Sequence, residues 1–121
     1  MGSAALVCLA MNIYFEARGE SLKGQKLVAE VTLNRVRSKK WPSTLCEVVH
    51  EPYQFSWTIN PYQVQDWKAF STALIVAESA MNNNLNTCVD HYHNFTVEPT
   101  WGKNMRVYRV EGNHIFYCSE N

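Results

Sequence analysis

The chain has 121 residues and a mass of 13.9 kDa, a size that fits one domain over residues 1–121 and excludes a two-domain enzyme, an eight-unit β/α barrel or a capped solenoid. Its 11 basic and 11 acidic side chains leave a formal net charge of zero, so broad electrostatic capture of nucleic acid or of an anionic membrane is not expected. Hydrophobic residues make up 46% of the chain, which suits a globular core, and the 12% aromatic share leaves rings available for a ligand.

The first half of the sequence predicts three helices. Apolar residues between Ser3 and Gly19 recur at the spacing of one buried helix face, and Gly19 ends this helix or opens a turn. Ser21 caps a second helix, which stops before Pro42 because the residue before a proline disfavours a helical conformation. Residues 43–49 are expected to form a short third helix.

The second half changes from helix to strand. Residues 51–57, rich in rings and small polar groups, are expected to form a loop, and a fourth helix is predicted over about 66–81. Residues 91–95 look extended, and the β-prone runs 105–110 and 114–118 predict a hairpin around a glycine-containing loop. The fold class that follows is α+β, a helical body followed by a small β-ribbon.

Four cysteines are present, and none of them forms a C-x-x-C pair, so a zinc ribbon or a thioredoxin-type motif has no support. The favoured interpretation is that all four are small buried hydrophobic side chains. The alternative is at least one disulfide, for example a bridge that joins the chain ends through Cys8 and Cys118. Four cysteines allow three connectivities, and the sequence does not choose among them. The cysteines are Cys8, Cys46, Cys88 and Cys118.

The apolar segment Ala4–Ala10 is too short to cross a membrane, and no basic residue precedes it as in a signal peptide. We therefore expect no stable membrane insertion. The sequence leaves the route of export open.

Glu16 is the first candidate for chemistry. It comes near the end of an apolar helix, directly after two aromatic rings, and an apolar wall disfavours the charged form of a carboxyl group. The pKa of Glu16 should therefore rise, as a general acid at neutral pH requires. For Glu20 we expect a local role, as acceptor for backbone amides or as partner of Arg18. Composition and spacing alone favour a plainer interpretation of the segment, a helix end with two solvated carboxylates.

Two further clusters could serve a ligand. The loop Q-F-S-W beginning at Gln54 combines neutral hydrogen-bonding groups with flat apolar rings, a mixture that suits sugars, although its rings could equally tuck under the domain. His91 and His93 share one face of an expected strand. Together with His114 on the hairpin they could form a three-histidine zinc site, or they could be structural.

Short motifs follow one another along nearly the whole chain, in the order C-L-A, E-A-R-G-E-S, G-Q, L-N-R-V, Q-F-S-W, H-Y-H, P-T-W and G-N-H-I-F-Y. In this order they resemble the SleB/CwlJ-type cell wall hydrolase family. Residues 62–86 carry little of the resemblance.

The resemblance implies a small lysozyme-like domain that cleaves peptidoglycan glycan strands at the bacterial cell wall, between N-acetylmuramic acid and N-acetylglucosamine. The catalytic glutamate of the family corresponds to Glu16. The implied reaction is that of a lytic transglycosylase, in which Glu16 protonates the leaving oxygen and the muramyl 6-hydroxyl then attacks C1 to give a 1,6-anhydro end. No metal or cofactor is expected, and the chain is expected to act as a monomer.

The substrate-binding residues are expected to surround Glu16. Amide and hydroxyl groups would hold sugar hydroxyl or N-acetyl groups, and rings would face the sugars. Two histidines would offer hydrogen bonds from the wall of the glycan-binding groove. The residues in these roles are Gln54, Ser56, Trp57, His91, Tyr92, Trp101 and His114. Tyr14 and Phe15 are expected to shape the surroundings of Glu16.

Three alternatives remain at this point. The first is a hydrolytic muramidase in which Glu20 helps to place a water molecule. The second is a zinc amidase or peptidase that uses His91, His93 and His114. The third is a non-catalytic module that binds glycans through the aromatic loop.

Overall fold

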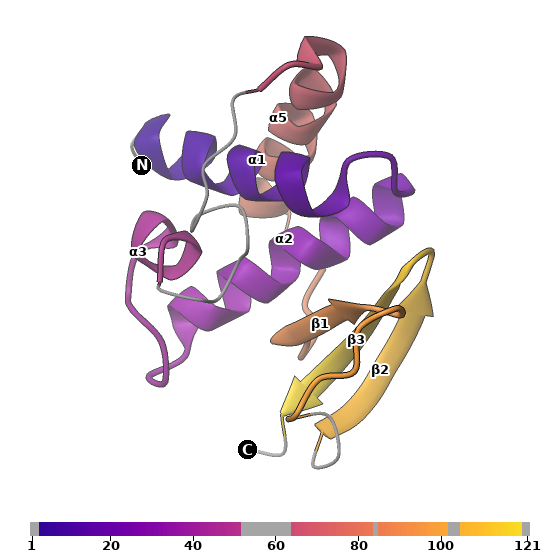
Figure 1. The fold of residues 1–121 in the computed structure, drawn as a ribbon. Coiled ribbons are helices and arrows are strands. Elements are labelled where there is room, and N and C mark those ends of the chain that lie inside the picture. Colours follow the sequence, from indigo (N-terminus) through magenta and orange to yellow (C-terminus); the bar gives the residue numbers. More distant parts are fainter. Residues whose placement is uncertain (1–2, 52–63, 84, 102–104, 120–121) are drawn as a thin grey trace.

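The computed structural model describes residues 3–51, 64–83, 85–101 and 105–119. Their elements, in chain order, are α1 (Ser3–Ala17), α2 (Leu22–Arg37), α3 (Leu45–Val49), α5 (Trp67–Asn82), β1 (His91–Asn94), β2 (Met105–Glu111) and β3 (His114–Ser119). The helices form one body and the three strands form a small sheet on one side of α2 (Figure 1). The predicted α+β class is therefore confirmed. In this part of the chain, no helix combines the length and the apolar character needed to cross a membrane.

Helix starts are set by capping side chains. Ser21 accepts a hydrogen bond from the Gly24 amide at the start of α2, and Asp66 does the same for Ala69 at the start of α5. Thr44 caps α3, which is why this helix begins at Leu45 rather than at residue 43. These contacts confirm the predicted helices to within two residues at each start.

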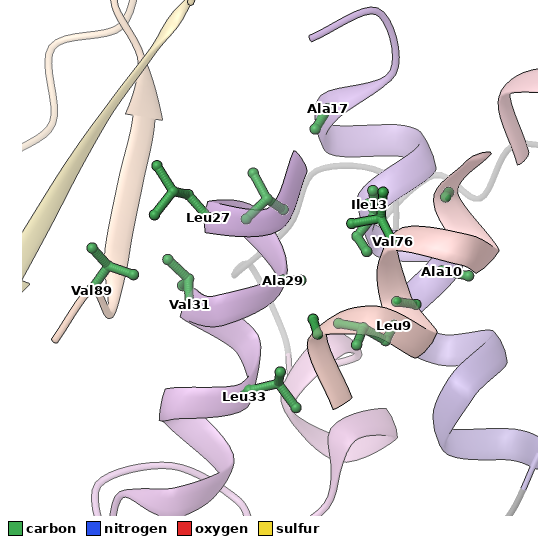
Figure 2. Close-up of a cluster of buried hydrophobic side chains, with 14 of the residues drawn as sticks. Leu9, Ala10, Ile13, Ala17, Leu27, Ala29, Val31, Leu33, Val76 and Val89 are labelled. Atoms are coloured by element: carbon green, nitrogen blue, oxygen red, sulfur yellow. The ribbon is translucent and has the colours of Figure 1, made fainter. Parts of the chain in front are cut away.

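The core forms on both sides of α2. On one side, Leu27 and Val31 point toward Val89, which comes just before the sheet (Figure 2). On the other side lie the apolar faces of α1 and α5, with Ile13 and Val76 as members. All five side chains are at most 2% exposed, so each contributes about 1.5–3 kcal/mol to the hydrophobic stabilisation. α2 is thus the central element that joins the helical body to the sheet.

The sheet is antiparallel with the strand order β1-β3-β2. The register places Tyr92 opposite Phe116 and Asn94 opposite His114. Phe116 belongs to the core, so these side chains face the helices, and the alternating side chains His91 and His93 face the other way. The hairpin predicted from the sequence is confirmed, with a glycine at φ +59° in its turn.

Two disulfides connect all four cysteines. Cys8–Cys46 joins α1 to α3, and Cys88–Cys118 joins the segment before β1 to β3. The interpretation as four free buried side chains is therefore wrong, and so is the suggested pairing of Cys8 with Cys118. The reason is the position of α2, because α1 packs on its helical side and the sheet on the other, which separates these two cysteines.

Candidate active site

Glu16 lies in the last turn of α1 and reaches toward the sheet. Its Oε1 atom accepts a hydrogen bond of 2.8 Å from the hydroxyl of Tyr92 on β1. Burial raises the pKa of Glu16 above its ordinary value, and this effect outweighs the opposing effects of the Tyr92 hydrogen bond and of the positive charge of Arg35. Glu16 therefore keeps its proton to higher pH than an ordinary carboxyl group, as the sequence predicted for a general acid.

Tyr92 is the direct neighbour of this carboxyl group. Its pKa lies well above the ordinary value because of burial and of the nearby Glu16 charge, so its hydroxyl stays protonated and remains a donor. Asn12, which is fully buried on α1, also hydrogen-bonds this hydroxyl. The Tyr92 ring contacts His114 and Phe116 with centroid distances of 5.3 and 5.6 Å. In the structure the Tyr92 hydroxyl thus binds Glu16. The contact expected between the Tyr92 ring and a sugar remains a prediction.

Arg35 brings a positive charge to the same place. It projects from α2, is only 5% exposed, and donates from Nε to the carbonyl oxygen of Asp90 at 2.8 Å. Its guanidinium group also lies over the ring of Trp41, 5.0 Å from the centroid. Because a cation stabilises a carboxylate, Arg35 favours the deprotonated form of Glu16.

Polar side chains of α2 position the segment that leads into β1. Asn34 donates to the carbonyl oxygens of Thr87 and Val89, both at 2.9 Å. Glu30, which is fully buried, accepts from the amides of Leu85 and Thr87. Together with Arg35 these contacts fix the start of the strand that carries Tyr92, which explains the need for polar residues on an otherwise apolar helix.

Glu20 connects the turn after α1 to the hairpin. Its two oxygens accept hydrogen bonds from the amide and the side chain of Asn113, at 3.1 and 3.0 Å. A Cβ atom at Gly112 would lie 2.2 Å from Glu20 Oε1, so a side chain there would displace the Glu20 carboxylate from the turn. The expected role as acceptor for a backbone amide is confirmed, whereas the Arg18 side chain contacts Tyr14 instead of Glu20.

Replacing Glu20 with alanine is expected to lower the free energy of unfolding by about 2 kcal/mol, because two hydrogen bonds to a largely buried carboxylate are lost. Urea unfolding monitored by circular dichroism measures this change. The exposed Glu78 on α5 offers a control, since Glu78→Ala should change the free energy by no more than about 0.5 kcal/mol. Equal effects of the two substitutions would contradict the structural role of Glu20.

The outer face of the sheet carries a cluster of rings. Trp101 lies 4.8 Å from the His91 ring and 5.2 Å from the Tyr117 ring. His91 also contacts Trp41 at 5.7 Å, the ring that packs beneath Arg35. The structure thus brings the predicted residues Trp101 and His91 together and links them, through Trp41, to the surroundings of Glu16.

The three histidines of the zinc alternative do not converge. His91 and His93 lie on the outer face of the sheet, as their spacing predicted, but His114 lies on the face toward the helices. His114 is 5% exposed, and burial lowers its pKa, so the ring is neutral at neutral pH. Within the described ranges, no three His, Cys, Asp or Glu side chains gather closely enough to hold a metal ion. The hydrogen bond expected from His114 to the glycan, at the wall of the binding groove, remains a prediction.

Three of the predicted binding residues, Gln54, Ser56 and Trp57, lie outside the described residues. Of the two rings expected near Glu16, Phe15 packs with Tyr92 against Val49. Tyr14 instead accepts hydrogen bonds from the amides of residues 65 and 66 and positions the start of α5.

Sequence reasoning missed two residues of this site, Asn12 and Arg35. Both are polar and buried on helices with apolar faces, 0% and 5% exposed. A polar residue within an apolar helical face is the signal that could have identified them, because buried polar groups need a partner.

Comparisons with known proteins agree with this arrangement. A family model described as cell wall hydrolase matches residues 19–117. The catalytic domain of the germination-specific lytic transglycosylase SleB from Bacillus anthracis superposes with a TM-score of 0.79 and 29% identity, over 97% of this chain and 96% of that chain. The catalytic domain of the Bacillus cereus SleB protein gives a TM-score of 0.76 and 28% identity, over 96% and 91%. These matches confirm the lysozyme-like α+β fold.

Two curated relatives are longer proteins. A spore cortex-lytic enzyme of Bacillus cereus is 30% identical over 114 residues, which are 89% of this chain and 42% of the relative. A spore cortex-lytic enzyme of Bacillus subtilis is 44% identical over 48 residues, 40% of this chain and 16% of the relative. The chain therefore spans less than half the length of these relatives.

Proposed function

Because this chain belongs to the cell wall hydrolase family, we propose that it cleaves peptidoglycan glycan strands at the bacterial cell wall, between N-acetylmuramic acid and N-acetylglucosamine, as a lytic transglycosylase. The observation that carries the proposal is the partly buried carboxyl group of Glu16 with its raised pKa, held by the Tyr92 hydroxyl. The structural likeness to SleB catalytic domains over nearly the whole chain supports it.

The Tyr92 hydrogen bond suggests which oxygen of Glu16 reacts. The hydroxyl donates to Oε1, so the acid proton resides on Oε2. In the first step Oε2 passes this proton to the glycosidic oxygen as the C1–O bond breaks. In the second step the 6-hydroxyl of the muramyl sugar attacks C1 and returns its proton to Glu16. No water is consumed, and the product carries a 1,6-anhydro end.

The hydrolytic alternative needs a group that places a water molecule. Glu20, the candidate from the sequence, uses both oxygens to bind Asn113 in the hairpin. This engagement favours attack by the sugar hydroxyl over attack by a water that Glu20 holds.

Sugar contacts extend the proposal to the rest of the site. Gln54 and Ser56 would hold hydroxyl or N-acetyl groups, and the Trp57 ring would face a sugar. Trp101, with His91 beside it, would contact sugars of the glycan strand that lie further from the cleaved bond. The reason is that their ring cluster reaches Arg35, near Glu16, only through Trp41. We propose that the chain acts as a monomer without a cofactor.

Digestion of purified peptidoglycan followed by mass analysis of the products tests the proposal. Anhydro-muramyl ends are the expected result, and reducing muramyl ends would establish a hydrolytic muramidase instead. Full activity after exhaustive chelation is expected, since the histidines of the zinc alternative lie on opposite faces of the sheet. Binding to purified sacculi without loss of turbidity would identify a non-catalytic glycan-binding module.

Replacing Tyr92 with phenylalanine is expected to shift the alkaline limb of the pH profile of kcat/KM to higher pH. The hydroxyl stabilises the carboxylate of Glu16, so its loss raises the pKa of Glu16 and keeps the acid protonated further into the alkaline range. We also expect kcat to fall about tenfold, the order of one hydrogen bond to a charged group. A shift to lower pH would contradict the donor role of Tyr92.

A further inference from the structure

Glu51 is a carboxylate near Arg35 that takes no part in the proposed proton transfer. It follows His50, the C-cap of α3, and its amide donates to the carbonyl oxygen of Val48 at 3.4 Å. The Cys8–Cys46 disulfide joins α3 to α1, the helix that carries Glu16. The backbone of Glu51 is therefore held to α3, and the disulfide holds α3 to the helix that carries Glu16.

Glu51 lies within range of the charge of Arg35, the same cation that acts on Glu16. Burial lowers the pKa of Arg35, and neighbouring acidic groups oppose this effect; these groups are Tyr92, Asp90, Glu51 and Glu16. Glu51 and Glu16 thus act on the same guanidinium group. A carboxylate beside this cation is tolerated in a partly buried site because the two charges attract each other.

The other acidic groups in this environment have hydrogen-bond partners. Asp90 accepts hydrogen bonds from the amide and the hydroxyl of Ser119 and contacts His91 at 3.0 Å. Glu16 accepts from Tyr92. Glu51 Oε1 is different, because it is buried and has no hydrogen-bond partner within the described part of the chain.

A buried acceptor without a partner destabilises the folded protein, so native structures keep very few of them. An ionised carboxylate can only accept hydrogen bonds. Such an atom near Arg35, whose charge also acts on Glu16, is accounted for if a ligand supplies the donor. A glycan strand is rich in suitable donors, namely hydroxyl groups and N-acetyl amide groups.

We propose that Glu51 Oε1 accepts a hydrogen bond from a hydroxyl or an N-acetyl amide of the sugar next to the bond that Glu16 cleaves. This inference rests on the proposed function, since it takes the glycan strand as the ligand. Glu51 is then a substrate-binding residue that holds the sugar in register with Oε2 of Glu16. The bond forms with substrate and transition state alike, so its loss acts on binding more than on the chemical step.

Binding of peptide-free peptidoglycan glycan chains, measured by calorimetry in a Glu16→Gln background that does not turn the ligand over, gives the direct test. Adding Glu51→Ala is expected to raise Kd by about 10-fold to 100-fold, the range of a hydrogen bond to a charged group. Adding Glu51→Gln should restore part of the affinity, because the amide keeps an acceptor oxygen. Adding Glu78→Ala, on the exposed side of α5, should leave Kd unchanged.

A Kd for the Glu51→Ala protein equal to that of its parent would overturn the inference. So would equal losses for Glu51→Ala and Glu51→Gln accompanied by a lower melting temperature, which would assign Glu51 a structural role beside Arg35. In otherwise wild-type protein, we expect Glu51→Ala to raise KM with kcat changed only a few-fold. Absence of glycan cleavage by the wild-type protein would refute the proposed function, whereas the binding measurement would still decide the role of Glu51.

Discussion

Replacing Glu16 with glutamine is expected to lower the rate of glycan cleavage by about 10³-fold while the fold remains intact. Glutamine has nearly the same shape, and its carbonyl oxygen can still accept the hydrogen bond that Tyr92 donates to Oε1. It has no acidic proton, so the leaving oxygen departs without protonation and the 6-hydroxyl finds no base. The loss should therefore appear in kcat and leave the affinity for the glycan largely unchanged.

Release of glycan fragments from purified peptidoglycan, quantified by mass spectrometry, measures this effect, and circular dichroism and the melting temperature verify the fold. Glu20→Gln provides the matched control, because Glu20 lies four residues away and binds the hairpin rather than the reacting atoms. Glu20→Gln should retain cleavage within a few-fold. A folded Glu16→Gln protein with wild-type activity would refute the assignment of Glu16, and Glu20 would be the next residue to test.

Removing either disulfide is expected to lower the free energy of unfolding by about 4 kcal/mol, according to the chain-entropy relation for sequence separations of 38 and 30 residues. A domain of this size is stable by only about 5–15 kcal/mol, so the loss is a large share of the total. The melting temperature should fall by about 10–15 °C for each bridge. The reason is that the bridges restrict the unfolded chain more than the folded one.

Two double variants carry out this test, one with serine at Cys8 and Cys46 and one with serine at Cys88 and Cys118. Calorimetry gives the melting temperatures, and a mass under non-reducing conditions four hydrogens below that of the reduced protein verifies both bridges in the parent. A double variant as stable as the parent would refute the structural role of that bridge. Four free thiols in the parent would refute the pairing itself.

Much of the fold could be predicted because local signals are strong in this sequence. Ser21 and Asp66 cap helices in the structure as their residue types suggest. The hairpin turn at Gly112 follows from a glycine between two β-prone runs. The pairing of the cysteines could not be predicted, because it depends on which elements face each other across α2. That arrangement is a property of the packing and not of any local segment.

The candidate site was predictable in part for the same reason. The apolar setting of Glu16 is local, since it comes from the helix that carries it. Its hydrogen bond with Tyr92 joins residues 76 positions apart and follows from tertiary packing. The spacing of His91 and His93 predicts that they share one face of the sheet. Only the register between β1 and β3 shows that His114 lies on the opposite face.

The two disulfides also bear on where this domain can fold to its full stability. Thiols are kept reduced in the cytosol, and bridges persist in oxidising compartments. While it remains among cytosolic reductants, the chain would lack both connections, the one between α1 and α3 and the one between β3 and the approach to β1. The domain would therefore reach its full folding stability only in an oxidising environment, where both bridges can form and persist.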